Sequence, residues 1–242
     1  QNKYFHWTHA VLIGVMVGAL TLKAQVRSKN GLIALYDFSG KGNVIRDLAK
    51  GKRPLHLKIS DMDAVRRNPG SMEVVRDVLI ATERKALEIS SPIKRSGSMT
   101  VEAWITPRDK TLRGPSRIVS LSKNALVRNF TLAQEGNRFD VRLMTSRTDR
   151  NGMPSLASAG GAIRAEMTHV VYTFGTDGFA RIYLNGRENS KQKVGGRTSG
   201  WNEGFRLSLA NENARDRAWR GTYHLVAIYN RALNGKEVTA HF

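Results

Sequence analysis

Short runs of alternating apolar and polar residues dominate the chain after residue 30 and predict β-strands. These runs occupy 31–38, 99–106, 117–121, 130–132, 138–144, 169–174, 180–184, 205–209 and 222–229. Turn-forming residues separate them, and helical periodicity is nearly absent. Many short strands at this spacing are typical of an antiparallel β-sandwich or jelly roll. The pattern leaves short helices or loops at 72–79, 161–166 and 234–241.

A β-hairpin over 179–188 is the best-defined local prediction. Its two strands flank Asn185-Gly186, a dipeptide that readily takes the positive φ angles of a two-residue hairpin turn. We therefore expect these two strands to pair as neighbours in one sheet.

The first 23 residues have a different pattern. Tyr4 to Leu22 is a run of 19 residues without Lys, Arg, Asp or Glu. As a helix this run would extend roughly 28 Å, close to the roughly 30 Å hydrocarbon thickness of a bilayer. We therefore expect a transmembrane helix over 1–23, a linker over 24–30 and a single β-sandwich domain over 31–242.

Aromatic and basic residues mark the two ends of this predicted helix. Tyr4 and Trp7 suit the membrane interface, and Lys23 follows the apolar run. The alternative is a secretory signal peptide cleaved after Ala24. The bases that follow the helix favour a cytoplasmic domain, but long domains cross membranes regardless of charge. We expect a single-pass membrane protein whose domain is periplasmic or extracellular.

Small residues line one face of the predicted helix. Ala10, Gly14 and Gly18 recur at four-residue intervals, a pattern that lets two helix backbones approach closely in lipid. We therefore expect other membrane subunits as partners. His6 and His9 lie near the predicted membrane edge, where an ordinary interfacial role is far commoner than ligation of a haem or pigment.

The composition is strongly basic. The chain contains 39 Lys and Arg against 20 Asp and Glu, a net charge of +19. This excess favours anionic partners: an acidic protein face, a lipid surface or an acidic carbohydrate, with nucleic acid the least expected. Lys50, Lys52 and Arg53 form the candidate contact, although such runs are also common in ordinary solvated loops. No cysteine is present, which excludes disulfides and thiol catalysis.

Five segments follow one another in an order known from one protein family. They are GLIALYDFSG (31–40), SMTVEAWITP (98–107), MTHVVYTFG (167–175), ARIYLNGR (180–187) and GTYHLVAIYNRALNGKEV (221–238). In this order the chain resembles a laminin-G-like domain of the concanavalin A-like lectin/glucanase superfamily. The resemblance implies two antiparallel sheets in a jelly roll. It also implies binding of sugars, lipids or proteins more often than catalysis.

The carboxylates and histidines give no catalytic pattern. Glucan-cleaving enzymes of this superfamily carry a Glu-x-Asp-x-Glu strand, which places its carboxylates on one face. This chain has only Glu102 in the corresponding strand, and we expect that side chain to face solvent. The superfamily's lyases need a Tyr, His and Arg together, and His169, Tyr172, Tyr183 and His224 are more typical of ordinary strand residues. We expect no enzymatic activity.

A calcium site is a weaker expectation. The resemblance places Asp37 and Asp47 in segments that correspond to the family's calcium rim. His224 stands where the family commonly has an aspartate, and calcium needs several hard oxygen ligands. Calcium is therefore optional, and we expect no required cofactor.

Two functions fit the sequence best, and a degenerate hydrolase or lyase is a third, less favoured alternative. The first is a non-catalytic accessory subunit of a larger membrane complex, such as a photosynthetic or respiratory one, which contacts its neighbours through the helix and the basic domain. The alternative is a cell-surface carbohydrate-binding module. In that case Trp201 and Trp219, which lie in predicted loops, are the candidates for stacking on sugar rings.

Overall fold

A computed structural model describes residues 27–242. The predicted transmembrane helix, its interface residues and its glycine-lined face lie outside the described residues and stay predictions. In the described range, no helix has the length and apolar character needed to cross a bilayer.

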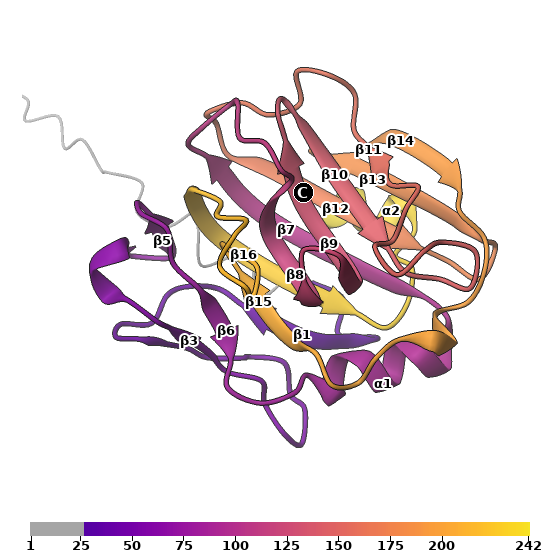
Figure 1. Cartoon of the computed structure of the whole chain (residues 1–242), viewed down its shortest axis with the longest axis horizontal. Helices are drawn as coiled ribbons and strands as arrows, with labels where there is room; N and C mark the ends of the chain where they lie inside the picture. The colour runs from indigo at the N-terminus through magenta and orange to yellow at the C-terminus, as the bar shows by residue number, and fades with distance from the viewer. Residues whose placement is uncertain (1–26) are drawn as a thin grey trace, which may run out of the picture.

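The strands of residues 27–242 form two antiparallel sheets that pack face to face (Figure 1). Sheet A follows the order β14-β13-β12-β7-β16-β5-β4, and β1 pairs with β16. Its strands are β1 (Leu32–Tyr36), β4 (Val65–Asn68), β5 (Ser71–Val74), β7 (Met99–Pro107), β12 (Thr168–Phe174), β13 (Phe179–Leu184), β14 (Arg187–Lys193) and β16 (Gly221–Tyr229).

Sheet B follows the order β11-β10-β9-β8-β15-β6-β3-β2. Its strands are β2 (Val44–Ile45), β3 (Leu57–Ile59), β6 (Ile80–Thr82), β8 (Ser116–Asn124), β9 (Val127–Glu135), β10 (Arg138–Leu143), β11 (Leu156–Ala157) and β15 (Arg206–Leu209). The chain crosses repeatedly between the two sheets, for example from β5 to β6 and from β7 to β8. The predicted all-β sandwich is therefore confirmed.

The strand β7 shows how the core is divided. Val101 and Ala103 point between the sheets into the main core, because alternate residues of a strand face opposite sides. Glu102 and Trp104 point to the outer face of sheet A. That face is also buried, since the chain's C-terminal residues and a second apolar cluster containing Val238 cover it.

Two α-helices and two short 3-10 turns complete the described fold. The α-helices are α1 (Leu87–Ser96) and α2 (Gly235–His241), and the 3-10 turns are η1 (Met62–Ala64) and η2 (Thr198–Gly200). The α1 helix lies along one edge of the sandwich near β1 and η2 (Figure 1). Its Ile89 and Ile93 are buried one turn apart, and Gly97 ends it in the left-handed conformation.

The N-cap residue Asn234 begins α2 with a capping box. Its side chain accepts a hydrogen bond from the backbone of Glu237, and the Glu237 carboxylate accepts one from the Asn234 amide. The segment 234–241, for which the sequence left a short helix or a loop open, is a helix.

The local predictions have mixed outcomes. The hairpin turn is confirmed, since Asn185 and Gly186 have φ angles of 48° and 77°. No helix occupies 72–79, because Met72 belongs to β5.

The helix α1 was not predicted, and neither were the short strands β2 to β6 and β11. The predicted linker also needs correction, because Arg27 is buried against sheet A.

Candidate functional site

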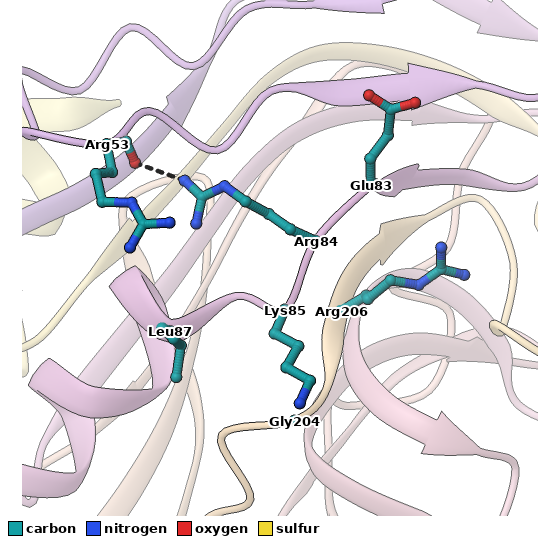
Figure 2. A pocket seen from close by; sticks show the side chains of 7 residues that line it. All are labelled: Arg53, Glu83, Arg84, Lys85, Leu87, Gly204 and Arg206. Carbon is teal, nitrogen blue, oxygen red and sulfur yellow. Dashed lines mark hydrogen bonds between the residues drawn. The ribbon is translucent and has the colours of Figure 1, made fainter.

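A basic depression lies where β6, the start of α1 and the start of β15 meet (Figure 2). It has a volume of about 620 Å³, within the range of ligand sites. Three distant chain segments build it. Its lining residues are Arg53, Glu83, Arg84, Lys85, Leu87, Gly204 and Arg206.

One wall of the depression is fixed by Arg84. Its guanidinium donates to both carboxylate oxygens of Glu88, in the first turn of the adjoining helix, at 2.7 Å. It also donates to the backbone carbonyls of Arg53 at 3.0 Å and Pro54 at 3.1 Å. Figure 2 shows this side chain reaching across to Arg53. Arg84 therefore joins the loop around residue 53 to α1, and its hydrogen-bonding groups are largely used for that purpose.

Of the three other bases of the depression, Arg53 pairs with Glu88 at 3.5 Å, whereas Lys85 and Arg206 are available to a ligand. Lys85 is exposed and extends toward Gly204 in Figure 2. Arg206 donates to the side-chain oxygen of Asn213 at 3.1 Å. Across residues 27–242, neither Lys85 nor Arg206 has an acidic group within 4.0 Å. The one acid of the lining, Glu83, pairs with Lys58 at 2.8 Å. The depression therefore carries an excess of positive charge.

The predicted basic run falls partly on this site. Arg53 lines the depression and also a second hollow, a groove beside β1 that contains Lys50. Lys52 is exposed but lines neither hollow. The sequence therefore identified one residue of the depression, whereas Lys85 and Arg206 were not singled out.

A buried polar network covers the outer face of sheet B next to Arg206. Ser122 donates to Glu212, and Ser120 is within 2.8 Å of the Ser122 hydroxyl. The Glu212 carboxylate also accepts a hydrogen bond from Arg117 at 3.1 Å. All four of these residues are at most 1% exposed. Since Arg206 pairs in register with Ser122, the network places this arginine at the edge of the depression.

Sheet A has its own buried charged cluster, and it overturns the prediction for Glu102. This carboxylate is fully buried rather than solvent-facing. It accepts hydrogen bonds from Arg27 at 2.8 Å, His169 at 2.9 Å and His241 at 3.2 Å. The solvent-facing prediction failed because residues distant in sequence cover this side of the sheet.

The hydrogen bonds assign the protonation of His241. Its Nδ1 must donate, because the Glu102 carboxylate only accepts. Its Nε2 accepts from the backbone N–H of Ser28 at 3.1 Å, so it carries no proton. The C-terminal helix is therefore held to the segment around residue 28 by a neutral imidazole.

Burial and hydrogen bonding act in opposite directions on this cluster. Burial alone would raise the pKa of Glu102, but hydrogen bonds from His169 and His241 and the charge of Arg27 hold it well below its usual range. Burial lowers the pKa of His169, although its hydrogen bond to Glu102 opposes that shift. The cluster is a charged carboxylate with one permanent cation and two imidazoles.

The two tryptophans predicted to stack on sugars require correction. Trp201 is 2% exposed and donates its indole N–H to the carbonyl of Met144 at 2.8 Å. Trp219 is fully buried and donates to the side chain of Gln134 at 3.0 Å. Both rings pack in the main core, so neither presents a face to a ligand.

The calcium candidates have local structural roles. The Asp47 carboxylate accepts hydrogen bonds from the backbone amides of Leu35, Ala49 and Leu55 at 2.9–3.0 Å. Asp37 accepts from Ser39 in a short turn. The range 27–242 contains no group of three or more His, Cys, Asp or Glu arranged to hold a metal ion. Calcium binding stays an untested expectation.

The residues considered for lyase chemistry, His169, Tyr172, Tyr183 and His224, do not all lie on one face of sheet A. His169 points to the outer face of sheet A, where it contacts Glu102. Tyr172 lies on the same strand but points into the main core. His224 instead contacts the Thr106 hydroxyl at 3.1 Å.

Comparison with known proteins identifies the family and the fold. A family model described as the concanavalin A-like lectin/glucanases superfamily matches residues 82–239. No curated protein matches the sequence.

Several solved structures share the fold at low sequence identity. Trypanosoma rangeli sialidase, in complex with the inhibitor DANA, is 16% identical, with a TM-score of 0.62 over 86% of this chain and 32% of the sialidase. The binding domain of botulinum neurotoxin DC, in complex with rat synaptotagmin II, is 14% identical, with a TM-score of 0.65 over 87% of this chain and 51% of that chain.

A further similar structure concerns botulinum neurotoxin type C, whose cell entry is described as dependent upon interaction with two ganglioside molecules. It is 15% identical, with a TM-score of 0.63 over 87% of this chain and 50% of that chain. This chain thus spans about a third of the sialidase and about half of the neurotoxin binding domains. At these identities the similarity establishes the fold alone.

Proposed function

The chain belongs to the concanavalin A-like lectin/glucanases superfamily, and from this premise we propose that it is a non-catalytic module that binds an anionic carbohydrate. The carbohydrate carries carboxylate or sulfate groups and binds in the basic depression between β6, α1 and β15. The observation that carries the proposal is the pair Lys85 and Arg206, two bases on one concave surface without an acidic partner in the described chain.

The charge of the whole chain supports an anionic ligand over a neutral one. A net charge of +19 raises the local concentration of anions around the domain. Within the depression, Arg206 offers a planar guanidinium that suits carboxylate or sulfate oxygens, and Lys85 offers a mobile point charge. Neutral sugars are bound mainly through exposed aromatic rings. Because the two candidate tryptophans are buried, this surface favours charge recognition.

The absence of a catalytic role is part of the same proposal. Glu102 is enclosed by Arg27 and two histidines and has no access to a substrate. The carboxylates near the depression, Glu83 and Glu88, are both engaged in ion pairs with bases. These contacts support binding rather than acid–base chemistry. Assembly with membrane subunits remains a prediction that rests on residues 1–23.

A binding series on the full chain tests the proposal. The ligands are a heparin hexasaccharide, an oligogalacturonate of similar length and maltohexaose as the neutral arm. We expect both anionic ligands to bind and the neutral one to bind at least about tenfold more weakly. The double variant K85E/R206E should weaken anion binding by about tenfold or more, since two attractive contacts become repulsive.

A matched control distinguishes binding at the depression from a general effect of net charge. K110E/K123E makes the same change in net charge at two exposed lysines that line neither hollow. We expect this control to reduce affinity by no more than about twofold, through the long-range field alone. Equal losses in both double variants, or equal binding of maltohexaose, would refute a site at the depression.

A further inference from the structure

The second hollow, the groove beside β1, differs from the depression in its chemistry. It has a volume of about 850 Å³. Its floor and one rim are apolar, formed by Leu32, Ile33, Leu35 and Leu48. Its bases are Arg27, Lys29, Lys50 and Arg53, and its acids are Asp47 and Glu88. An apolar floor beneath a basic rim suits a ligand that combines a negative head with hydrocarbon.

The acids in the groove are already used by the protein. Asp47 is committed to backbone amides, and Glu88 is paired with Arg84. Lys29 and Lys50 are exposed, and no acidic group of residues 27–242 lies within 4.0 Å of either. The positive charge of the rim is therefore not neutralised by the described chain.

The loop that forms the apolar rim is held firmly. The amide of Leu48 donates to the carbonyl of Leu35 at 2.8 Å, and the Asp47 carboxylate accepts from the amides of Leu35 and Ala49 at 3.0 Å. In this position the Leu48 side chain is 43% exposed, although it is large and apolar. Leu48 is thus held in a solvent-exposed position beside Lys29 and Lys50, which have no acidic partner in the described chain. Lipid-binding surfaces combine apolar and basic groups in the same way.

The sequence also places the groove near a predicted membrane segment. Lys29 follows Leu22, the last residue of the uncharged run, by only seven positions. Even a fully extended connection of that length spans no more than roughly 25 Å. Lipid headgroups at a membrane surface would therefore be within reach of the groove whenever that run is inserted in a bilayer.

We propose that the groove binds an anionic glycerophospholipid, with Lys29 and Lys50 contacting the phosphate and Leu48, Leu32 and Ile33 contacting the glycerol and the first acyl carbons. The pairing of charge and apolar surface selects this ligand over a free phosphate, which needs no apolar floor, and over a zwitterionic lipid, whose head has no net charge. Arg53 is the one residue that lines both this groove and the depression, and neither proposal rests on it, so the two proposals are independent.

Short-chain lipids below their micelle concentration test this site on the full chain in non-ionic detergent. The probes are dihexanoylphosphatidylglycerol, glycerol 3-phosphate and dihexanoylphosphatidylcholine, measured by isothermal titration calorimetry. We expect the anionic lipid to bind at least about tenfold more tightly than either of the others. Equal binding of glycerol 3-phosphate, or of phosphatidylcholine, would overturn the proposal.

Variants assign the binding to the groove. K29E/K50E should weaken binding of the anionic lipid about tenfold or more, and Leu48→Asn should weaken it about threefold with an unchanged melting temperature. K85E/R206E, in the depression, and K110E/K123E, outside both hollows, should bind the lipid within about twofold of the parent chain. Because Leu48→Asn adds no charge, loss of binding there excludes a purely electrostatic effect. Unchanged binding in both K29E/K50E and Leu48→Asn would contradict the site.

Discussion

A single carboxylate, Glu102, holds both ends of the described chain on sheet A. Arg27 binds it from the N-terminal side and His241 from the C-terminal side, while His169 on β12 completes its contacts. Because the carboxylate is fully buried, loss of Arg27 would leave its charge unpaired, and loss of either histidine would leave it without a hydrogen bond. This residue therefore stabilises the position of α2 and of the segment that leads to the groove.

Removing the charge of Glu102 should destabilise the fold strongly. We expect Glu102→Gln to lower the free energy of unfolding by about 3 kcal/mol or more, because Arg27 stays buried without a counter-charge. Urea denaturation measures this value. The control is Glu83→Gln, which breaks the exposed pair with Lys58 and should cost less than about 1 kcal/mol. A similar cost for both variants would refute the structural role of Glu102.

The same cluster makes stability depend on pH. The pKa values of His169 and Glu102 are both lowered in the folded state, so the unfolded chain binds more protons. Their stabilising contribution is present above the ordinary pKa of each group and is lost as pH falls. We expect the free energy of unfolding to decline as the pH drops below the ordinary histidine value of 6.5, and further below the ordinary glutamate value of 4.5.

Denaturation curves at several pH values check this dependence. In His169→Gln, whose amide can still donate to Glu102, the part of the decline that begins near pH 6.5 should become smaller. A fold that is equally stable, or more stable, as the pH falls from 7 to 5 would contradict the assignment.

At the scale of elements, tight loops fix the positions of the strands. Gly152 has a φ of 71°, and a Cβ there would lie 2.7 Å from the backbone nitrogen of Leu143. Gly42 has a similar φ of 82°, but a Cβ there would meet nothing within 4 Å. The two glycines therefore share the same backbone requirement and differ in the space around them.

Alanine at these two glycines should have unequal effects. Gly42→Ala should lower the free energy of unfolding by about 1 kcal/mol, because only the unfavourable backbone conformation contributes. In Gly152→Ala the added methyl group also collides with the backbone of β10. We expect this variant to lower the free energy of unfolding by about 3 kcal/mol or more. Thermal unfolding of both variants gives the comparison. Equal melting temperatures would show that the loop around Gly152 shifts freely.

Element prediction succeeded where a strand was long enough to show its period. Strands such as β7, β12 and β16 alternate over seven to nine residues, and all three were predicted. The strands β2 and β11 have two residues each, too few for any period to be recognised. The helix α1 escaped prediction because it contains Pro92 and two adjacent serines, residues that seldom occupy a helix interior.

The site was less predictable than the strands, for a topological reason. The depression joins Arg53, the segment 83–87 and Arg206, and only the first belongs to a visible basic run. Glu102 was misjudged because α2 and Arg27, at opposite ends of the described chain, cover its face. Burial that depends on such distant segments leaves no local signal in the sequence.

At the scale of the whole molecule, the fold determines where the positive charge is concentrated on the surface. The sandwich buries its apolar residues in two layers and places most of its bases on the surface. Two hollows concentrate that charge, one polar and one with an apolar floor, and they share Arg53. Our two proposals assign an anionic sugar to the first hollow and an anionic lipid to the second.

The most direct test of the central claim is backbone NMR of the full chain during titration with the heparin hexasaccharide. Our account predicts saturable shift changes centred on Arg53, Lys85, Gly204 and Arg206, and none of comparable size in the variant K85E/R206E. Shift changes scattered over all basic surfaces, or centred away from these residues, would contradict the account.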